Sequence, residues 1–239
     1  MPLERYLVLL VQIIEYGVFY LIFKKWIFGV KVVWRIFGYI SIQDIFKRNR
    51  MFTLLAQYIK GITEIDQRDL DLIFSKFSLI RTKRNEILVD YDEICKRHYF
   101  VNKGTIRVYT INVEGVETTR YFAFQGEFGT ALPSLIDQQP AFEYLQTIDK
   151  SELLTISRAD FYFLIDEIPA FALVYRRILE NGFIIAQKRI YGFQGFTALE
   201  KVNWIRAHQP DLLLRVSNKM AASYLGISSS TLSRIKSRL

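Results

Sequence analysis

The C-terminal part of the chain carries apolar residues at the spacing of helices. Residues 160–167 form a predicted short helix, which Pro169 ends. At 1.5 Å per residue, the longer helix predicted over 170–193 would span about 36 Å. Its apolar stripe favours a coiled-coil-like seam between two copies, with a core helix inside one chain as the alternative. The stripe consists of Phe171, Val174, Ile178, Leu179, Phe183, Ile185 and Ile190.

The middle of the chain, residues 63–165, carries mainly the alternating pattern of β-strands. It opens with a predicted short helix over 65–77, and runs of alternating or β-branched residues follow. Turn-forming residues such as Asn102-Lys103-Gly104 separate these runs. So many short strands at this spacing predict an antiparallel barrel or roll. The predicted strands are 86–89, 97–102, 105–112, 117–124, 144–147 and 152–157.

The first 50 residues are apolar and basic, unlike the rest of the chain. Residues 7–23 are nearly all apolar, and residues 26–40 are apolar but interrupted by two cations. Three interpretations compete: a translation artefact before a true start at Met51, a marginal membrane anchor, and a basic amphipathic helix on a surface. We therefore expect a membrane partner only if residues 1–50 belong to the native protein. A chain that starts at Met51 would open with an amphipathic helix over 52–62.

The net charge of +8 is unevenly distributed along the sequence. Residues 1–50 carry +5, residues 51–200 carry −3 and residues 201–239 carry +6. A basic end after a mildly acidic middle indicates that this end faces a polyanion. The single cysteine excludes an internal disulfide and a four-cysteine zinc or iron–sulfur site. We expect no metal, no cofactor and a cytoplasmic location.

The last 24 residues have the layout of a helix-turn-helix. A first helix over 218–225 is predicted to end at Gly226, where a tight turn needs positive φ. Ser228 or Ser229 can cap the second helix, whose buried face would hold Leu232 and Ile235. Its other face is polar and basic, as base and phosphate contacts require, although an ordinary helical hairpin remains the alternative. The candidate DNA-binding residues are Lys219, Ser229, Ser230, Ser233, Arg234, Lys236 and Arg238.

These stretches resemble the Crp/Fnr superfamily of bacterial transcription regulators, in its short form. The resemblance covers about residues 52–239. In the C-terminal part it rests on 197–202 (TALEKV), 209–212 (QPDL), 221–227 (AASYLGI) and 231–235 (TLSRI). In the middle of the chain it rests on 102–104 (NKG) before a strand that ends at Val108-Tyr109, on 125–128 (QGEF), on 151–157 (SELLTIS) and on Asp160-Phe161.

The resemblance implies an α+β chain of three parts after the extension at 1–50. Residues 51–168 would form an antiparallel jelly-roll sensor like the cyclic nucleotide-binding domain. A long dimerisation helix over 169–195 and a small all-α helix-turn-helix domain over 196–239 would follow. Homodimers of this family bind paired half-sites, with one recognition helix in each major groove. By position, base contacts fall on Ser229, Ser230 and Arg234, but relatives often carry larger or charged residues at the first two.

The resemblance also locates a sensor pocket that lacks the usual partners of a cyclic nucleotide. In cyclic-nucleotide binders of this fold, a Gly-Glu step opens the phosphate-binding helix and an arginine neutralises the phosphate. Here Gly129 is followed by Thr130, and no Lys or Arg occurs between Arg120 and Lys150. We therefore expect no standard binding of cyclic AMP, because a buried phosphate would lack a cation. A different effector, or none, would face Gly126, Glu127, Phe128, Thr130, Leu132 and Phe142, whose apolar members could equally be core residues.

These patterns predict a sequence-specific DNA-binding transcription regulator that acts as a homodimer. No Walker loop, GxSxG elbow, HExxH motif or dinucleotide fingerprint is present, so we do not expect an enzyme. Double-stranded DNA is the expected partner, and a contact with RNA polymerase would fit the same role. The alternative is a ligand-binding signalling module, membrane-tethered or soluble, that does not bind DNA.

Overall fold

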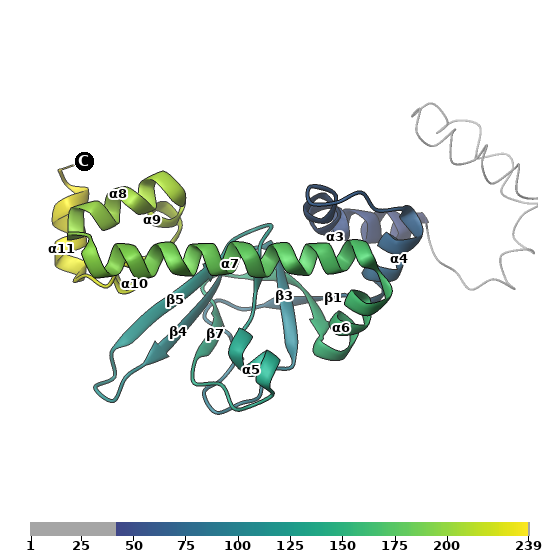
Figure 1. The fold of residues 1–239 in the computed structure, drawn as a ribbon, viewed down its shortest axis with the longest axis horizontal. Helices are drawn as coiled ribbons and strands as arrows, with labels where there is room; N and C mark the ends of the chain where they lie inside the picture. Colours follow the sequence, from purple (N-terminus) through teal and green to yellow (C-terminus); the bar gives the residue numbers. More distant parts are fainter. Residues whose placement is uncertain (1–41, 239) are drawn as a thin grey trace, which may run out of the picture. The chain divides into compact units, whose positions relative to one another are not determined.

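The computed structural model describes residues 42–238 (Figure 1). The apolar runs at 7–23 and 26–40, with their three interpretations, lie outside this part of the chain. The chain divides into two compact units, Met1–Asn49 and Arg50–Leu239, and every strand among the described residues lies in the second. Helix α3, Ile42–Lys60, runs through Met51 and includes most of the helix predicted over 52–62. None of the described helices is long and apolar enough to span a membrane.

Two four-stranded antiparallel sheets form the β-roll, and they contain all six predicted strands. One sheet has the order β1-β8-β3-β6 and the other β2-β7-β4-β5. Strands β1 and β6 were not predicted from the sequence pattern. The bounds are β1 Ser78–Thr82, β2 Ile87–Val89, β3 Arg97–Lys103, β4 Ile106–Ile111, β5 Glu117–Ala123, β6 Phe128–Gly129, β7 Tyr144–Thr147 and β8 Ser151–Ser157.

The turn that joins β3 to β4 depends on a glycine. Gly104 has a φ of +102°, a region that L side chains rarely adopt. A Cβ atom there would also overlap the side chain of Ser151 at the start of β8. Asp149 secures the same corner, because its carboxylate accepts a hydrogen bond from the backbone N–H of Thr105 at 2.9 Å. The Asn102-Lys103-Gly104 turn is thus packed against Asp149 and Ser151, at the start of β8.

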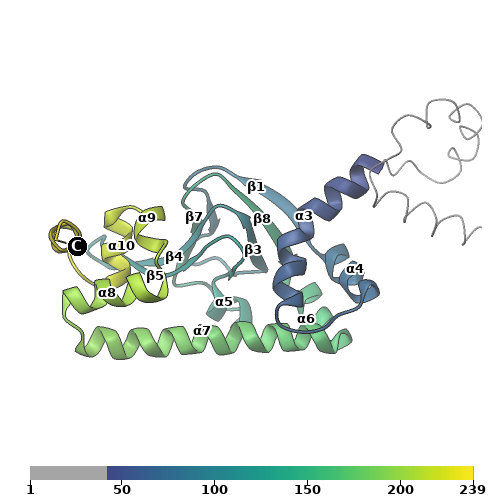
Figure 2. The ribbon, with the colours of Figure 1, turned by 90° about the horizontal axis from the view of Figure 1, so that it is seen from above.

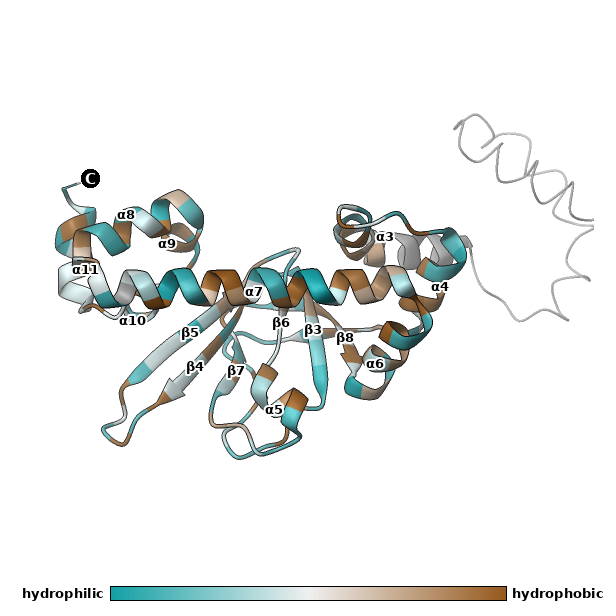
Figure 3. Ribbon diagram, viewed as in Figure 1, coloured by the Kyte–Doolittle hydropathy of each residue, from teal (hydrophilic) through white to brown (hydrophobic). Residues whose placement is uncertain are grey.

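Helices precede, interrupt and follow the strands of the β-roll. Helix α4 is Gln67–Lys76, α5 is Leu132–Asp137 and α6 is Arg158–Glu167. Helix α7, Pro169–Gly195, is 27 residues long and passes across the sensor from α6 toward α8 (Figures 1 and 2). Apolar and polar bands alternate along it (Figure 3). The C-terminal helices are α8 Ala198–His208, α9 Leu212–Arg215, α10 Asn218–Leu225 and α11 Ser229–Lys236.

The buried apolar side chains form three clusters. One packs α3, α4, α6 and the start of α7 on the first sheet, and it includes Phe100, Phe161 and Phe171. A second fills the space between the two sheets, around Ile106 and Leu145. A third lies inside α8–α11 and continues onto the β-roll, because Phe122, Phe124 and Ile148 of the β-roll belong to it. Its buried members are Phe122, Ile148, Val202, Ile205, Leu212, Val216, Ala221, Ala222, Tyr224, Leu225 and Leu232.

Candidate nucleic-acid interface and sensor region

The turn between α10 and α11 has the geometry that the sequence predicted. Gly226 lies in the left-handed region, with φ 64° and ψ 40°, and its N–H donates to the carbonyls of Ala222 and Ser223. The N–H of Ile227 donates to the carbonyl of Ala222 at 3.1 Å, which completes a Schellman-type end to α10. Of the two predicted caps, Ser228 is the one used: its Oγ accepts from the N–H of Thr231 at 3.0 Å.

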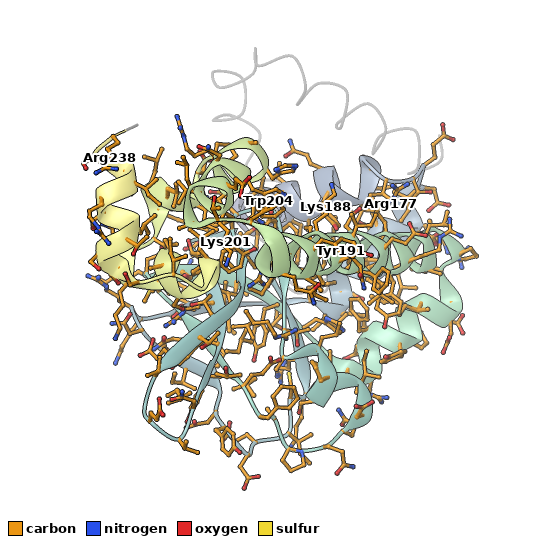
Figure 4. The ribbon with its side chains drawn as sticks, turned by 60° about the vertical axis from the view of Figure 1, so that its left-hand side comes forward. Arg177, Lys188, Tyr191, Lys201, Trp204 and Arg238 are labelled. Carbon is orange, nitrogen blue, oxygen red and sulfur yellow. The ribbon has the colours of Figure 1, made fainter. Side chains whose placement is uncertain are left out.

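Helix α11 buries an apolar side and exposes a polar one. Leu232 is fully buried and Ile235 is half-buried, so both face the rest of the C-terminal helices. The candidate DNA-binding residues on α11 and just after it are all exposed, and Arg238 lies past the end of the helix (Figure 4). Lys219, on α10, is exposed as well. The structure therefore leaves every predicted basic and hydroxyl side chain of this segment exposed: Ser229, Ser230, Ser233, Arg234, Lys236 and Arg238.

The cations of this surface differ in what holds them. Among residues 42–238, the guanidinium of Arg234 contacts only the hydroxyl of Thr231, at 3.5 Å, one turn earlier in the helix. Lys236 Nζ instead donates to Asn218 Oδ1 at 3.0 Å and to the carbonyl of Leu213 at 3.3 Å, which ties α11 to α9 and α10. Lys219 Nζ lies 3.9 Å from a carboxylate oxygen of Glu117 on β5. Arg234 is thus held less firmly by the rest of the chain than Lys236 is.

Helix α10 packs directly on the sensor strand β5, beside which it lies in both views (Figures 1 and 2). The ring of Tyr224 is 5.4 Å from that of Phe122, measured between centroids. The guanidinium of Arg189, on α7, lies 4.0 Å from the centre of the Tyr224 ring and donates to the Tyr224 carbonyl at 3.3 Å. Burial lowers the pKa of Arg189. The helix-turn-helix is therefore docked on the β-roll as well as linked to it.

Hydrogen bonds within the β-roll hold α5 and the residues beside it in place. The hydroxyl of Thr130 donates to the carbonyl of Arg97 at 2.9 Å. Ser134 Oγ accepts from the N–H of Cys95 at 2.9 Å and donates to the carbonyl of Gln139 at 2.6 Å. The Gln138 side chain, at the C-cap of α5, donates to the carbonyls of Cys95 and Leu135. These bonds hold the helix against the loop before β3.

The predicted pocket residues do not share one environment. Phe128 packs in the core under α3 and α6, with its ring 5.0 Å from that of Phe100. Phe142 is 56% exposed, whereas Leu132 is half-buried. Gly126 and Glu127 form the turn between β5 and β6, where Glu127 accepts from the N–H of Phe124 at 2.9 Å. The apolar members thus include a core residue, the alternative that the sequence left open for them.

An ion pair between a buried carboxylate and an exposed arginine of the β-roll was missed by sequence reasoning. Glu143 is 1% exposed, and its two carboxylate oxygens accept from Nε and Nη2 of Arg120, each at 2.7 Å. Burial raises the pKa of Glu143, while Arg120 opposes the shift. The bidentate geometry makes this a strong pair. Arg120, the last cation before the predicted phosphate site, is therefore engaged by a carboxylate of the chain itself.

Two further residues of interest lie inside the sensor. Cys95 is fully buried, and its sulfur lies 3.3 Å from the hydroxyl of Thr130. The ring of His98 stacks on Phe161 with 3.9 Å between centroids, and burial lowers its pKa to about 3. Among residues 42–238, no group of three or more His, Cys, Asp or Glu side chains is placed to hold a metal.

Comparison with known proteins identifies the domain family of the β-roll. Residues 79–167 match the cyclic nucleotide-binding domain family. The fold resembles FixK2 from Bradyrhizobium japonicum, with TM-score 0.61, 18% identity, 68% of this chain and 84% of that one covered. It also resembles the c-di-GMP-responsive regulator CLP of Xanthomonas campestris, with TM-score 0.58, 15% identity, and 72% and 91% coverage.

A regulator of the Crp/Fnr family from Eubacterium rectale is similar to the same extent. Its TM-score is 0.57 at 17% identity, with 73% of this chain and 83% of that one covered. A comparison with curated proteins finds no match. Residues 79–167 belong to the cyclic nucleotide-binding domain family, and the chain has the fold of Crp/Fnr regulators. The resemblance inferred from the sequence is confirmed, as is the α+β jelly-roll fold.

Proposed function

We propose that this protein is a DNA-binding transcription regulator that acts as a homodimer and is not an enzyme. The observation that carries the proposal is α11: a capped helix after a glycine turn, with Leu232 buried and a face of hydroxyls and cations exposed. That face has the dimensions and chemistry that a major groove accepts. The net charge of +6 over residues 201–239 favours the same polyanionic partner. The fold shared with known regulators agrees with this role.

Helix α7 supplies the surface for the second copy. Leu179, Phe183, Ala186 and Ile190 follow one another at steps of four, three and four residues, which is the spacing of a coiled-coil seam. Phe183 is 65% exposed and Ile190 48% exposed, so the chain itself leaves these side chains uncovered. A twofold-related copy would cover this stripe and place two α11 helices for paired half-sites.

We expect that the sensor of this dimer does not bind cyclic AMP in the standard way. Ala141, 2% exposed, lies at the level where the resemblance implies an arginine, and Thr130 replaces the glutamate. The nearby Arg120 is bound by Glu143. We expect 1 mM cyclic AMP to leave the midpoint of thermal unfolding unchanged. A ligand at 100 times its Kd would add about 2.7 kcal/mol of stability, which such a measurement detects easily.

Selection of bound duplexes from a random pool tests the proposal, with the full chain as bait. We expect enrichment of a two-part site. Binding to the enriched duplex should then weaken with salt, with a log–log slope of about −0.9 for each phosphate contacted. The alternative function, a signalling module that contacts only proteins, predicts no duplex binding even at low salt. A contact with RNA polymerase remains a prediction that this experiment does not address.

A further inference from the structure

The contact between the helix-turn-helix and the sensor centres on two hydroxyl groups. Thr119, on β5, donates its backbone N–H to Ser223 Oγ on α10 at 2.8 Å. The two hydroxyl oxygens lie 2.7 Å apart and share a second hydrogen bond. Thr119 is fully buried, so water does not compete for these bonds. Two short bonds to one serine fix both the position and the direction of α10 on the strand.

A buried arginine sets the orientation of that threonine. Arg107, on β4, is 2% exposed, and its Nε donates to Thr119 Oγ1 at 2.8 Å. This bond uses one lone pair of the hydroxyl, so the hydroxyl remains free to share its second hydrogen bond with Ser223. Arg107 is itself held, since Nη1 donates to Glu117 Oε2 at 2.7 Å and the guanidinium lies 4.2 Å from the centre of the Tyr109 ring. The chain of contacts Arg107–Thr119–Ser223 is therefore rigid from the sheet to the helix.

Apolar packing beside this chain of contacts also holds α10 on the β-roll. Phe122 lies under Tyr224, and Ile148 belongs to the same buried cluster. The polar face of α11 nevertheless stays exposed in this docked arrangement. Docking thus presents the recognition helix and does not cover it.

We infer that Arg107, Thr119 and Ser223 are positioning residues for DNA recognition, an inference that rests on the proposed function. None of them needs to touch DNA. They fix the angle between α11 and the dimer helix α7, and so set the separation of the two recognition helices in the dimer. A helix-turn-helix held at one angle does not lose orientational freedom on binding, so a correctly spaced pair of half-sites gains affinity over a wrongly spaced pair.

The test measures spacing preference with the full chain. The probes are duplexes with the selected half-sites at the best separation, duplexes with that separation increased in 1 bp steps up to about half a helical turn, 5 bp, and a duplex with one half-site. Thr119→Val and Ser223→Ala remove the hydroxyl bonds with little change in volume. Thr118→Val, an exposed neighbour on β5, is the matched control. Thermal unfolding shows whether each variant is folded.

We expect Thr119→Val and Ser223→Ala to reduce the preference for the best spacing about 3- to 10-fold, the range that one or two hydrogen bonds supply. Their affinity for the single half-site should change less than about 2-fold, because α11 itself is intact. Thr118→Val should keep the wild-type preference. Arg107→Lys should reduce the preference as Thr119→Val does, and the double variant should add little, because the two residues act in series.

Three outcomes would overturn the inference. Folded variants that bind duplexes with the wild-type spacing preference would show that the contact does not position α11. Variants that bind the single half-site much more tightly than wild type would show that docking restrains the helix-turn-helix instead. A wild-type chain that binds no duplex would remove the proposed function and the positioning role together, so that failure is distinguishable from the first two.

Discussion

Arg234 is the residue that we propose reads a base. It is exposed, and its one hydrogen bond to the described residues, to Thr231, is long at 3.5 Å. We predict that Arg234→Ala weakens binding to the selected site by about 1–3 kcal/mol and binding to scrambled duplex by much less. Fluorescence anisotropy at one salt concentration measures both. Arg238→Ala is the control, expected to weaken both duplexes alike; equal losses for Arg234→Ala would make Arg234 a phosphate contact.

His98 gives the sensor a stability that depends on pH. Its ring is 5% exposed, and burial lowers its pKa to about 3. As pH falls below about 6.5, the unfolded chain binds a proton at this site that the folded chain does not, so folding becomes less favourable. Between pH 7 and pH 5 we predict a loss of about 2 kcal/mol from this group. Urea unfolding at the two pH values measures the change.

The matched variant is His98→Phe, which keeps a ring on Phe161 but cannot bind a proton. The loss on acidification should be smaller in this variant by the amount due to His98. Comparing the two proteins cancels the contribution of Glu143, whose raised pKa acts in the opposite direction. His208→Gln, at an exposed position, serves as the control. Parallel pH curves for wild type and His98→Phe would contradict the prediction.

At the scale of elements, the sequence predicted the long and strongly patterned segments well. The helix predicted over 170–193 is α7, Pro169–Gly195, because Pro169 fixes its start and its apolar stripe is continuous. Strand β1 was missed, since SLIRT is five residues long and lies exposed or half-buried along most of its length. The four-residue helix α9 was missed for a similar reason: one turn carries no periodicity.

The seam on α7 yields a prediction about assembly. Phe183 sits in the heptad stripe and is 65% exposed in the single chain. Phe183→Glu should convert the proposed dimer to monomers, because facing carboxylates would replace apolar contacts at the interface. Asn181→Glu adds the same charge on the opposite side of the helix and should leave the dimer intact. Sedimentation velocity distinguishes the two states, and a dimeric Phe183→Glu variant would place the interface elsewhere.

At the scale of the whole molecule, the sequence predicted the parts but not their contacts. The capped turn around Gly226 is local, so residue types at fixed offsets were sufficient to predict it. The pair Thr119 and Ser223 is 104 residues apart, and nothing in either segment indicates the other. Arg107 offered a weak signal, a cation inside a strand of otherwise mainly apolar residues. The sequence could not show that α10 covers that face, because coverage depends on the docking of two separately predicted domains.

The shared third cluster makes the stability of the helix-turn-helix depend on the sensor. Phe122 is 2% exposed and lies among the buried side chains of α8–α11. We predict that Phe122→Ala costs about 3–5 kcal/mol, as the loss of a buried aromatic ring usually does. Because this ring lies where α10 packs on the β-roll, its loss should weaken the contact between the two domains. Amides of α10 and α11 should then exchange hydrogen faster, while those of β3 and β8 keep their protection.

Leu145→Ala is the matched control for this prediction. Leu145 is fully buried between the two sheets and does not belong to the cluster of the C-terminal helices. Its loss, about 2–5 kcal/mol, should lower protection in the β-roll itself. Hydrogen–deuterium exchange with mass spectrometry resolves the two patterns. If both variants lowered protection evenly across the β-roll and the helices, the two domains would unfold as a single unit. The packing around Phe122 would then be part of one core, and the domains would not separate there.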